Sequence, residues 1–105
     1  MTALDKPHNL TELVAYQGGS IVSRALVAKS AGTVTLFAFD RGESLSEHIA
    51  PYDALILGVD GQLEVTLEGQ KYGLIDGDIL LLPANQPHAV LALKRSKMLL
   101  IMVRE

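Results

Sequence analysis

Residues 54–67, ALILGVDGQLEVTL, contain two strand-like runs separated by the pair Asp60-Gly61. Residues 54–59 are almost wholly apolar, whereas residues 62–67 alternate polar and apolar side chains. Because successive side chains of a strand point to opposite faces, the second run predicts one solvated face and one buried face. This stretch therefore indicates a β-sheet protein with a buried apolar layer.

Short strand-like runs of the same kind continue on both sides of this stretch. They are separated by Gly, Asp, Pro and Asn residues, which favour turns. The further runs are residues 21–27, 34–39, 79–82, 88–92 and 98–103. Many short strands at this spacing predict an all-β sandwich or barrel.

The N-terminal residues have a different pattern from the rest of the chain. Asn9 precedes Glu12 by three residues, as in a capping box, and apolar residues follow at helical spacing. This pattern predicts a short helix over residues 10–16 that ends at Gly18-Gly19. We therefore expect a single domain in which residues 1–19 form an arm with a short helix and residues 20–105 form a β-barrel.

Composition and charge limit the possible functions. The chain has 105 residues, of which 49% are apolar, and this suits one domain with a substantial core. With 9 basic and 12 acidic residues, the net charge of −3 argues against nucleic acid as a partner. The longest apolar run, residues 98–103, is far shorter than the roughly 20 residues of a membrane-spanning helix. The absence of cysteine excludes disulfides and thiolate sites, and we expect a soluble, cytoplasmic protein.

Two runs, residues 79–82 and 98–103, do not alternate and are apolar on both faces. Such strands need a cover on each side. The barrel interior supplies one cover, and either the N-terminal helix or a second subunit supplies the other. The pattern leaves both possibilities open, and we expect a homodimer.

Two segments carry motifs that resemble those of a known family. They are residues 42–61, GESLSEHIAPYDALILGVDG, and residues 77–88, GDILLLPANQPH. Both resemble the signature motifs of the cupin superfamily, and the chain is similar to its short, single-domain, RmlC-like barrels. The resemblance implies a small jelly-roll barrel, or double-stranded β-helix, whose first motif supplies two histidines and a glutamate to a metal and whose second motif supplies a third histidine.

The match to this implied ligand set is incomplete. His48 and His88 occupy histidine positions of the two motifs, whereas Ala50 stands at the other histidine position and Ala54 at the glutamate position. Two of the four side chains are therefore retained, and two imidazoles alone hold a metal weakly. Asn85 replaces the glycine of the second motif, and we expect the turn to survive because asparagine tolerates a positive φ.

Neighbouring residues offer few replacements for the missing ligands. Asp53 and Glu47 each adjoin a motif position, so in a regular strand they point away from the pocket. Tyr52 has the right parity, but neutral tyrosine is a rare ligand, and His8 lies in the N-terminal arm. We therefore expect no firmly bound cofactor and, at most, a weakly bound divalent metal at His48 and His88.

Three functions fit these observations. The first is a small-molecule-binding barrel of unassigned ligand, with no catalytic residue assigned and a mostly apolar cavity of about a few hundred Å³. Its expected pocket residues are His48, Ala50, Tyr52, Ala54, His88, Phe39 and Met102. The alternative is a metal-dependent oxygenase or isomerase with a nonstandard ligand set. The third is a structural homodimer whose barrel is filled by its own side chains.

The pair Asp60-Gly61 supports two conflicting local structures. Between two strand runs, an Asp-Gly pair predicts a tight hairpin. The family resemblance implies instead that Gly61 is a bend or bulge in a longer strand path. We favour the bend, which a pairing of Val59 with Gln62 would contradict.

Overall fold

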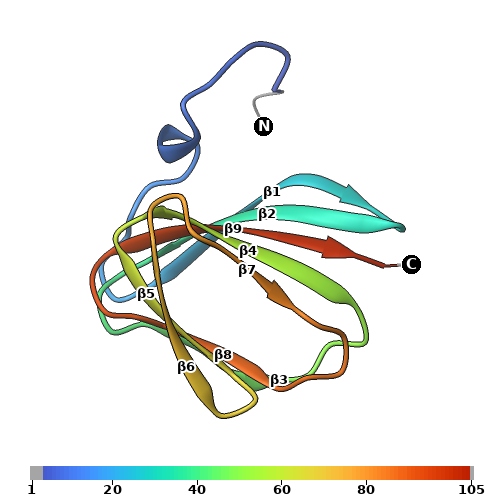
Figure 1. Cartoon of the computed structure of the whole chain (residues 1–105). Coiled ribbons are helices and arrows are strands. Elements are labelled where there is room, and N and C mark those ends of the chain that lie inside the picture. The colour runs from blue at the N-terminus through green and yellow to red at the C-terminus, as the bar shows by residue number, and fades with distance from the viewer. Residues whose placement is uncertain (1–3, 105) are drawn as a thin grey trace.

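The computed structural model of the protein describes residues 4–104, which form nine β-strands and one turn of 3-10 helix (Figure 1). The elements are η1 (Leu10–Glu12), β1 (Ile21–Lys29), β2 (Gly32–Phe39), β3 (Ser44–His48), β4 (Asp53–Asp60), β5 (Gln62–Leu67), β6 (Gln70–Ile75), β7 (Ile79–Leu82), β8 (His88–Ala92) and β9 (Ser96–Val103). Within the described range, no helix is long and apolar enough to cross a membrane.

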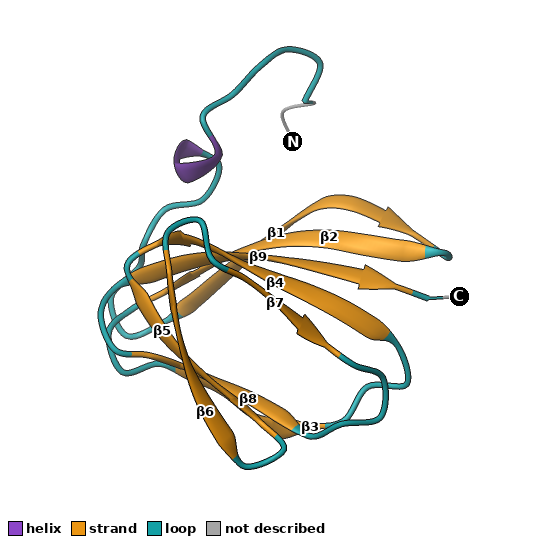
Figure 2. Ribbon diagram, viewed as in Figure 1, coloured by secondary structure: helices purple, strands orange, loops and turns teal. Residues whose placement is uncertain are grey.

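The strands form two antiparallel sheets that face each other, as Figure 2 shows. One sheet has five strands in the order β1-β2-β9-β4-β7, and the other has four in the order β3-β8-β5-β6. The prediction of an all-β jelly-roll barrel is confirmed. All seven sequence runs predicted as strands lie in strands, with bounds that differ by at most two residues.

The core lies between the two sheets and is built from alternate residues of each strand. The five-stranded sheet contributes Ile56, Leu82 and Met98, and the four-stranded sheet contributes Leu63 and Val65. Each of these side chains is almost completely buried. Burying such a side chain stabilises the fold by about 1.5–3 kcal/mol, so this layer is a major source of stability.

Strands β3 and β6 were not predicted from the sequence. They form the two edges of the four-stranded sheet, and most of their residues are exposed. An edge strand with little buried surface lacks the apolar alternation that identifies a strand in a sequence. Its conformation is decided by hydrogen bonds to the neighbouring strand.

The predicted helix over residues 10–16 is wrong in extent, because only η1 is helical. Asn9 caps this turn as expected, and its side chain accepts a hydrogen bond from the Thr11 amide at 3.1 Å. The next carbonyls are taken by side chains of the sheet: Lys97 Nζ donates to Thr11 O, and Arg24 donates to Leu13 O at 3.0 Å. A continuing helix would need these carbonyls for its own hydrogen bonds.

Both turn predictions that followed from the family motifs are confirmed. Strands β4 and β5 belong to different sheets and do not pair, so Gly61 is a bend and not part of a hairpin. Gly61 has a φ of 83° and Asn85 has a φ of 67°. Asparagine therefore takes the left-handed conformation that the family's glycine would adopt.

Gly61 also lies too close to the β8–β9 turn for a side chain to fit. An added Cβ would collide with the backbone carbonyl of Arg95 and with Ser96, whereas nothing lies within 4 Å of an equivalent Cβ at Gly69, whose φ is 79°. We expect Gly61→Ala to lower the free energy of unfolding by about 3 kcal/mol, from backbone strain plus the clash. The control Gly69→Ala has the strain alone and should cost about 1 kcal/mol. Urea unfolding measures both, and equal costs would contradict the steric argument.

Candidate functional site

The paired strands β3 and β8 bring the two motif histidines together. His48 lies at the end of β3 and His88 at the start of β8, directly opposite each other in the register. Their Nε2 atoms are 3.0 Å apart, and the rings meet edge to face with centroids 4.3 Å apart. The two histidines form one structural unit, although 40 residues separate them.

A bulge in β3 determines which face of the sheet the His48 side chain occupies. The strands pair regularly at Ser44↔Leu91 and Leu45↔Val90, and the register then shifts before His48. Regular pairing would place Glu47 opposite His88, because antiparallel partners advance one residue at a time. The extra residue puts His48 there instead, on the inner face that Leu45 and His88 share.

Hydrogen bonds to the backbone hold both rings. His48 Nδ1 lies 2.8 Å from the carbonyl oxygen of Ser46, and His88 Nδ1 lies 3.1 Å from that of Gln86. A carbonyl oxygen only accepts, so these contacts place a hydrogen on each Nδ1. Each Nε2 then has only a lone pair, and a hydrogen bond between the two Nε2 atoms requires one additional proton. A pair that holds this proton carries a single positive charge.

The two rings differ in their exposure to solvent. His48 is exposed, whereas His88 is only 8% exposed. Burial lowers the pKa of His88 below its ordinary value, the hydrogen bond to Gln86 opposes this shift, and the nearby His48 lowers the pKa further. His88 is therefore a ring in which burial disfavours the charged form.

The cavity beside this pair is small. Its volume is about 20 Å³, which is room for one water molecule. It is lined by Leu45, His48, Ile56, Leu82, His88, Val90, Met98 and Leu100. The expected cavity of a few hundred Å³ is therefore wrong in size, because the large side chains of both sheets fill the interior.

The other residues expected in the pocket do not line the cavity beside the histidine pair. Ala54 and Met102 are register partners on β4 and β9, and Ala54 is buried. Phe39 is fully buried and pairs with Ser96, at the opposite end of β9 from Met102. Phe39 and Ala54 belong to the buried core, whereas Met102 is only partly buried near the end of β9.

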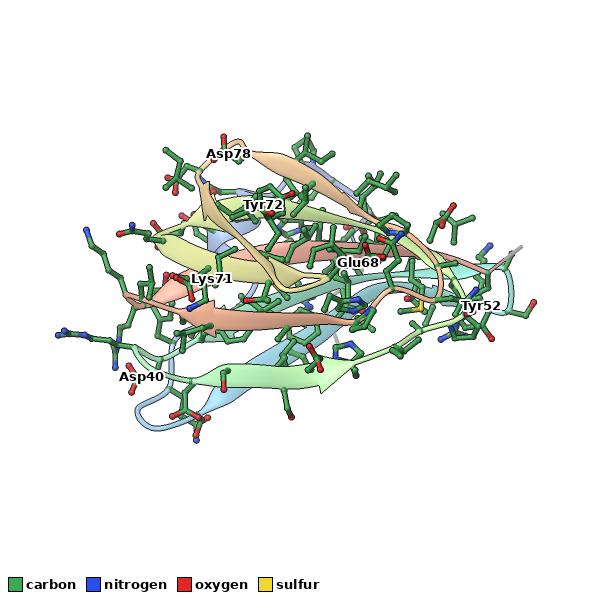
Figure 3. All side chains as sticks on the ribbon, turned by 60° about the horizontal axis from the view of Figure 1, so that its bottom comes forward. Asp40, Tyr52, Glu68, Lys71, Tyr72 and Asp78 are labelled. Atoms are coloured by element: carbon green, nitrogen blue, oxygen red, sulfur yellow. The ribbon has the colours of Figure 1, made fainter. Side chains whose placement is uncertain are left out.

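Ala50 and Tyr52 lie in the loop between β3 and β4. The carbonyl of Ala50 accepts a hydrogen bond from the Asn85 amide at 2.8 Å, which ties together the loops of the two motifs. Tyr52 points outward at one end of the molecule, with the Arg104 guanidinium 5.6 Å from its ring centroid (Figure 3). Tyr52 has the same sequence parity as Ala50 and Ala54. It lies in a loop and not in a strand, so the alternation of strand side chains does not determine where it points.

Among residues 4–104, no further side chain completes a metal site. Asp53 Oδ1 accepts a hydrogen bond from the Ala84 amide at 2.8 Å, so this carboxylate holds a loop. Glu47 and His8 are exposed. Over residues 4–104 there is no group of three or more His, Asp or Glu side chains that could hold a metal ion. The residues present therefore do not fit the four-ligand site that the family resemblance implies.

The cavity-lining residues other than the histidines were missed by sequence reasoning. Ile56 lies two positions after Ala54, and Met98 and Leu100 share the parity of Met102. Strict alternation from the proposed pocket residues would have found these three. Val90 follows His88 by two positions on β8 and would have been found in the same way, whereas Leu45 could be found only from the β3–β8 pairing, which the sequence did not reveal.

Comparison with known proteins agrees with this architecture. A model of the cupin domain family matches residues 35–104, which is most of the chain. The protein therefore belongs to the cupin domain family.

Two solved structures are similar over nearly the whole chain. A cupin superfamily protein from Desulfitobacterium hafniense is 33% identical, with 96% of this chain and 93% of that chain covered and a TM-score of 0.92. A cupin 2 conserved barrel domain protein from Leptotrichia buccalis is 45% identical, with a TM-score of 0.86, over 91% of this chain and 47% of that one. The second protein is thus about twice as long as the part that matches.

One curated enzyme shares a short segment. Quercetin 2,3-dioxygenase of Bacillus subtilis is 53% identical over 34 residues, which are 32% of this chain and 10% of the enzyme. The matched part is about a tenth of that enzyme's length, so this likeness does not transfer its activity.

The depressed pKa of His88 predicts that stability falls in mild acid. The unfolded chain takes up a proton at His88 near pH 6.5, whereas the folded chain does so only at lower pH. The free energy of unfolding should therefore be highest above about pH 6.5 and decrease as the pH falls towards 5. Urea unfolding between pH 5 and 8 measures this, and His88→Gln should flatten the profile. The control His8→Gln should leave it unchanged, and an identical slope in His88→Gln would contradict the assignment.

Proposed function

We propose that this protein is a small-molecule-binding cupin that holds the oxygen of a small acid at the His48–His88 pair, in the cytoplasm. The observation that carries the proposal is the 3.0 Å contact between two Nε2 atoms whose Nδ1 atoms are both held by carbonyls. A proton held between these Nε2 atoms would leave one positive charge at the open end of the barrel. A chain without cysteine is compatible with the cytoplasm.

The surroundings of the pair favour an anionic ligand. None of the cavity-lining side chains is a carboxylate, and six of the eight are apolar. A charge at an apolar surface is costly unless a partner neutralises it. A ligand carboxylate or enolate would supply that partner and accept a hydrogen bond from an imidazolium.

The size of the cavity limits how such a ligand binds. About 20 Å³ admits one oxygen atom or a water molecule and not a whole organic molecule. The body of the ligand would therefore lie outside the cavity, against exposed His48. The pair would then act as an anchor for one polar group.

A metal-dependent enzyme with a nonstandard ligand set is the second candidate. It is supported by the two Nε2 atoms that meet at one point and by the short likeness to a dioxygenase. It would need further ligands from the substrate or from water, because the described side chains offer only two.

Titration with acetate, followed through the imidazole signals in NMR, tests the proposed site. The signals of His48 and His88 should shift saturably, with a Kd on the order of millimolar for so small a probe. His8 in the N-terminal arm is an internal control and should not shift. In His88→Gln, affinity should fall about tenfold because the hydrogen-bonded pair is broken.

Two outcomes would contradict the proposed site. One is the absence of a saturable shift at His48 and His88. The other is near-stoichiometric iron, manganese, nickel or zinc in untagged protein, measured by elemental analysis. The second result would place the metal-dependent enzyme first.

A homodimer, as expected from the sequence, would cover an apolar face of the five-stranded sheet. Residues of the N-terminal segment, among them Val14, pack on one end of this face. On the uncovered part, Ile79 is 59% exposed and Leu81 is 50% exposed. Their cross-strand neighbours Leu57 and Leu55 extend the apolar surface toward β9. A second copy of the same apolar patch would bury these four side chains.

Substitution of Leu81 tests this dimer. We expect the wild type to sediment as a dimer at micromolar concentration and Leu81→Lys to sediment as a monomer, because the new charge would be buried at the interface. Ile49 is 61% exposed but lies in the β3–β4 loop, away from the sheet face, so Ile49→Lys is a matched control that should remain dimeric. Analytical ultracentrifugation distinguishes these results, and a monomeric wild type would refute the dimer.

A further inference from the structure

A second candidate site lies at the end of the barrel away from the histidine pair. The turn between β2 and β3 and the turn between β8 and β9 surround a surface hollow of about 530 Å³. Its lining residues are Asp40, Arg41, Leu93, Lys94 and Arg95. Figure 3 shows Asp40 at one end of the molecule and Tyr52 of the β3–β4 loop at the other.

Arg95 is held in place without the use of its terminal amino groups. Its Nε donates to Asp40 Oδ1 at 2.9 Å, and its guanidinium carbon lies 5.5 Å from the ring centroid of Tyr16. Tyr16 is fixed in turn, because its hydroxyl donates to Asp60 Oδ2 at 2.6 Å. The amino groups of Arg95 make no hydrogen bond within residues 4–104, and they remain available to an acceptor in the hollow.

The Asp40 carboxylate positions this arginine, and all of its contacts are to neighbouring groups of the protein. Its Oδ2 accepts from the Gly19 amide at 2.6 Å, and its Oδ1 accepts from the Arg41 amide at 2.9 Å. The Gly19 amide, followed by Arg95 and the Arg41 amide, lowers the pKa of Asp40 to about 2. The carboxylate is therefore ionised at every physiological pH, and its hydrogen bonds are directed to neighbours that it already holds.

The lining of the hollow carries an excess of positive charge. Arg41, Lys94 and Arg95 contribute three positive charges and Asp40 one negative charge, so the lining has a net charge of +2 in a chain of −3. The side chains of Arg41 and Lys94 are exposed and form no ion pair with any described residue. Cations gathered in a concave surface attract anions more strongly than scattered cations do.

We propose that Arg41, Lys94 and Arg95 form a binding site for a phosphate group. A phosphate monoester carries a charge close to −2 at neutral pH, which matches the excess charge of the lining. The planar guanidinium of Arg95 offers paired donors that fit two phosphate oxygens, and its fixed position lowers the entropy lost on binding. The hollow is confined to two turns, which suits free phosphate or a phosphorylated small molecule.

A ³¹P NMR titration with inorganic phosphate and with phenyl phosphate tests this site. We expect saturable binding of at least one probe to the wild-type protein, weakened as salt is raised. Arg95→Gln should reduce the affinity about tenfold or more, because one charge-assisted pair of hydrogen bonds is lost. The double variant Arg41→Gln/Lys94→Gln should reduce it by a similar factor while leaving the Asp40–Arg95–Tyr16 contacts intact.

Arg104→Gln is the matched control. It removes the same charge from an exposed arginine beside Tyr52, at the other end of the barrel, and should leave phosphate affinity unchanged. Tighter binding of phenyl phosphate than of inorganic phosphate would assign the site to a phosphorylated organic molecule, and the reverse order would assign it to free phosphate. An equal loss in Arg104→Gln would show attraction to charge in general, and this result, like the absence of saturable binding, would overturn the proposal.

Discussion

One apolar layer shared by two facing sheets constrains where polar chemistry can occur in this protein. The inner rows of both sheets meet in side chains such as Ile56, Val65 and Met98, which leave almost no solvent-accessible surface. Within residues 4–104, no buried side-chain nitrogen or oxygen lacks a hydrogen-bond partner. Polar groups are costly in such a layer unless they are paired, so functional groups gather at its two ends. The histidine pair lies at one end and the basic hollow at the other.

The bulge in β3 connects this packing to the chemistry of the histidine pair. Without the extra residue, Glu47 would lie opposite His88, and a carboxylate would face the apolar interior. With it, His48 faces His88 and each ring is held by the carbonyl of the residue two positions before it. One local irregularity thus changes the character of this end of the barrel from acidic to basic.

The two ends also differ in how their charged groups are held. The His88 ring is buried. Its Nδ1 contacts the carbonyl oxygen of Gln86, and its Nε2 contacts the imidazole of His48. Arg95 stays exposed and is positioned by an aromatic face and a carboxylate that is itself held by backbone amides. The charge of a histidine changes with pH in the physiological range. The guanidinium of Arg95 stays charged, and its contacts fix its position.

Much of the fold could be read from the sequence because alternation and turn residues are local signals. The runs that became β4, β5, β7 and β9 are apolar on the faces that they bury, and Gly61 and Asn85 occupy turns that need a positive φ. Strands β3 and β6 gave no such signal because they are exposed edges. The predicted helix was too long because the side chains of Arg24 and Lys97, which are distant in the sequence, donate hydrogen bonds to the carbonyls that a longer helix would use.

Residue patterns and motifs were enough to predict an all-β cupin barrel that retains His48 and His88 and has alanine at the two other ligand positions. The contact between the two rings, the burial of one and exposure of the other, and the small size of the cavity beside them depend on how the strands pair and pack. The tertiary structure also brings Arg41 and Arg95 to the same hollow. The physical reason is that strand pairing joins residues far apart in the chain, and a bulge alters which face a side chain occupies. Neither strand pairing nor a bulge can be predicted from the local pattern of residues.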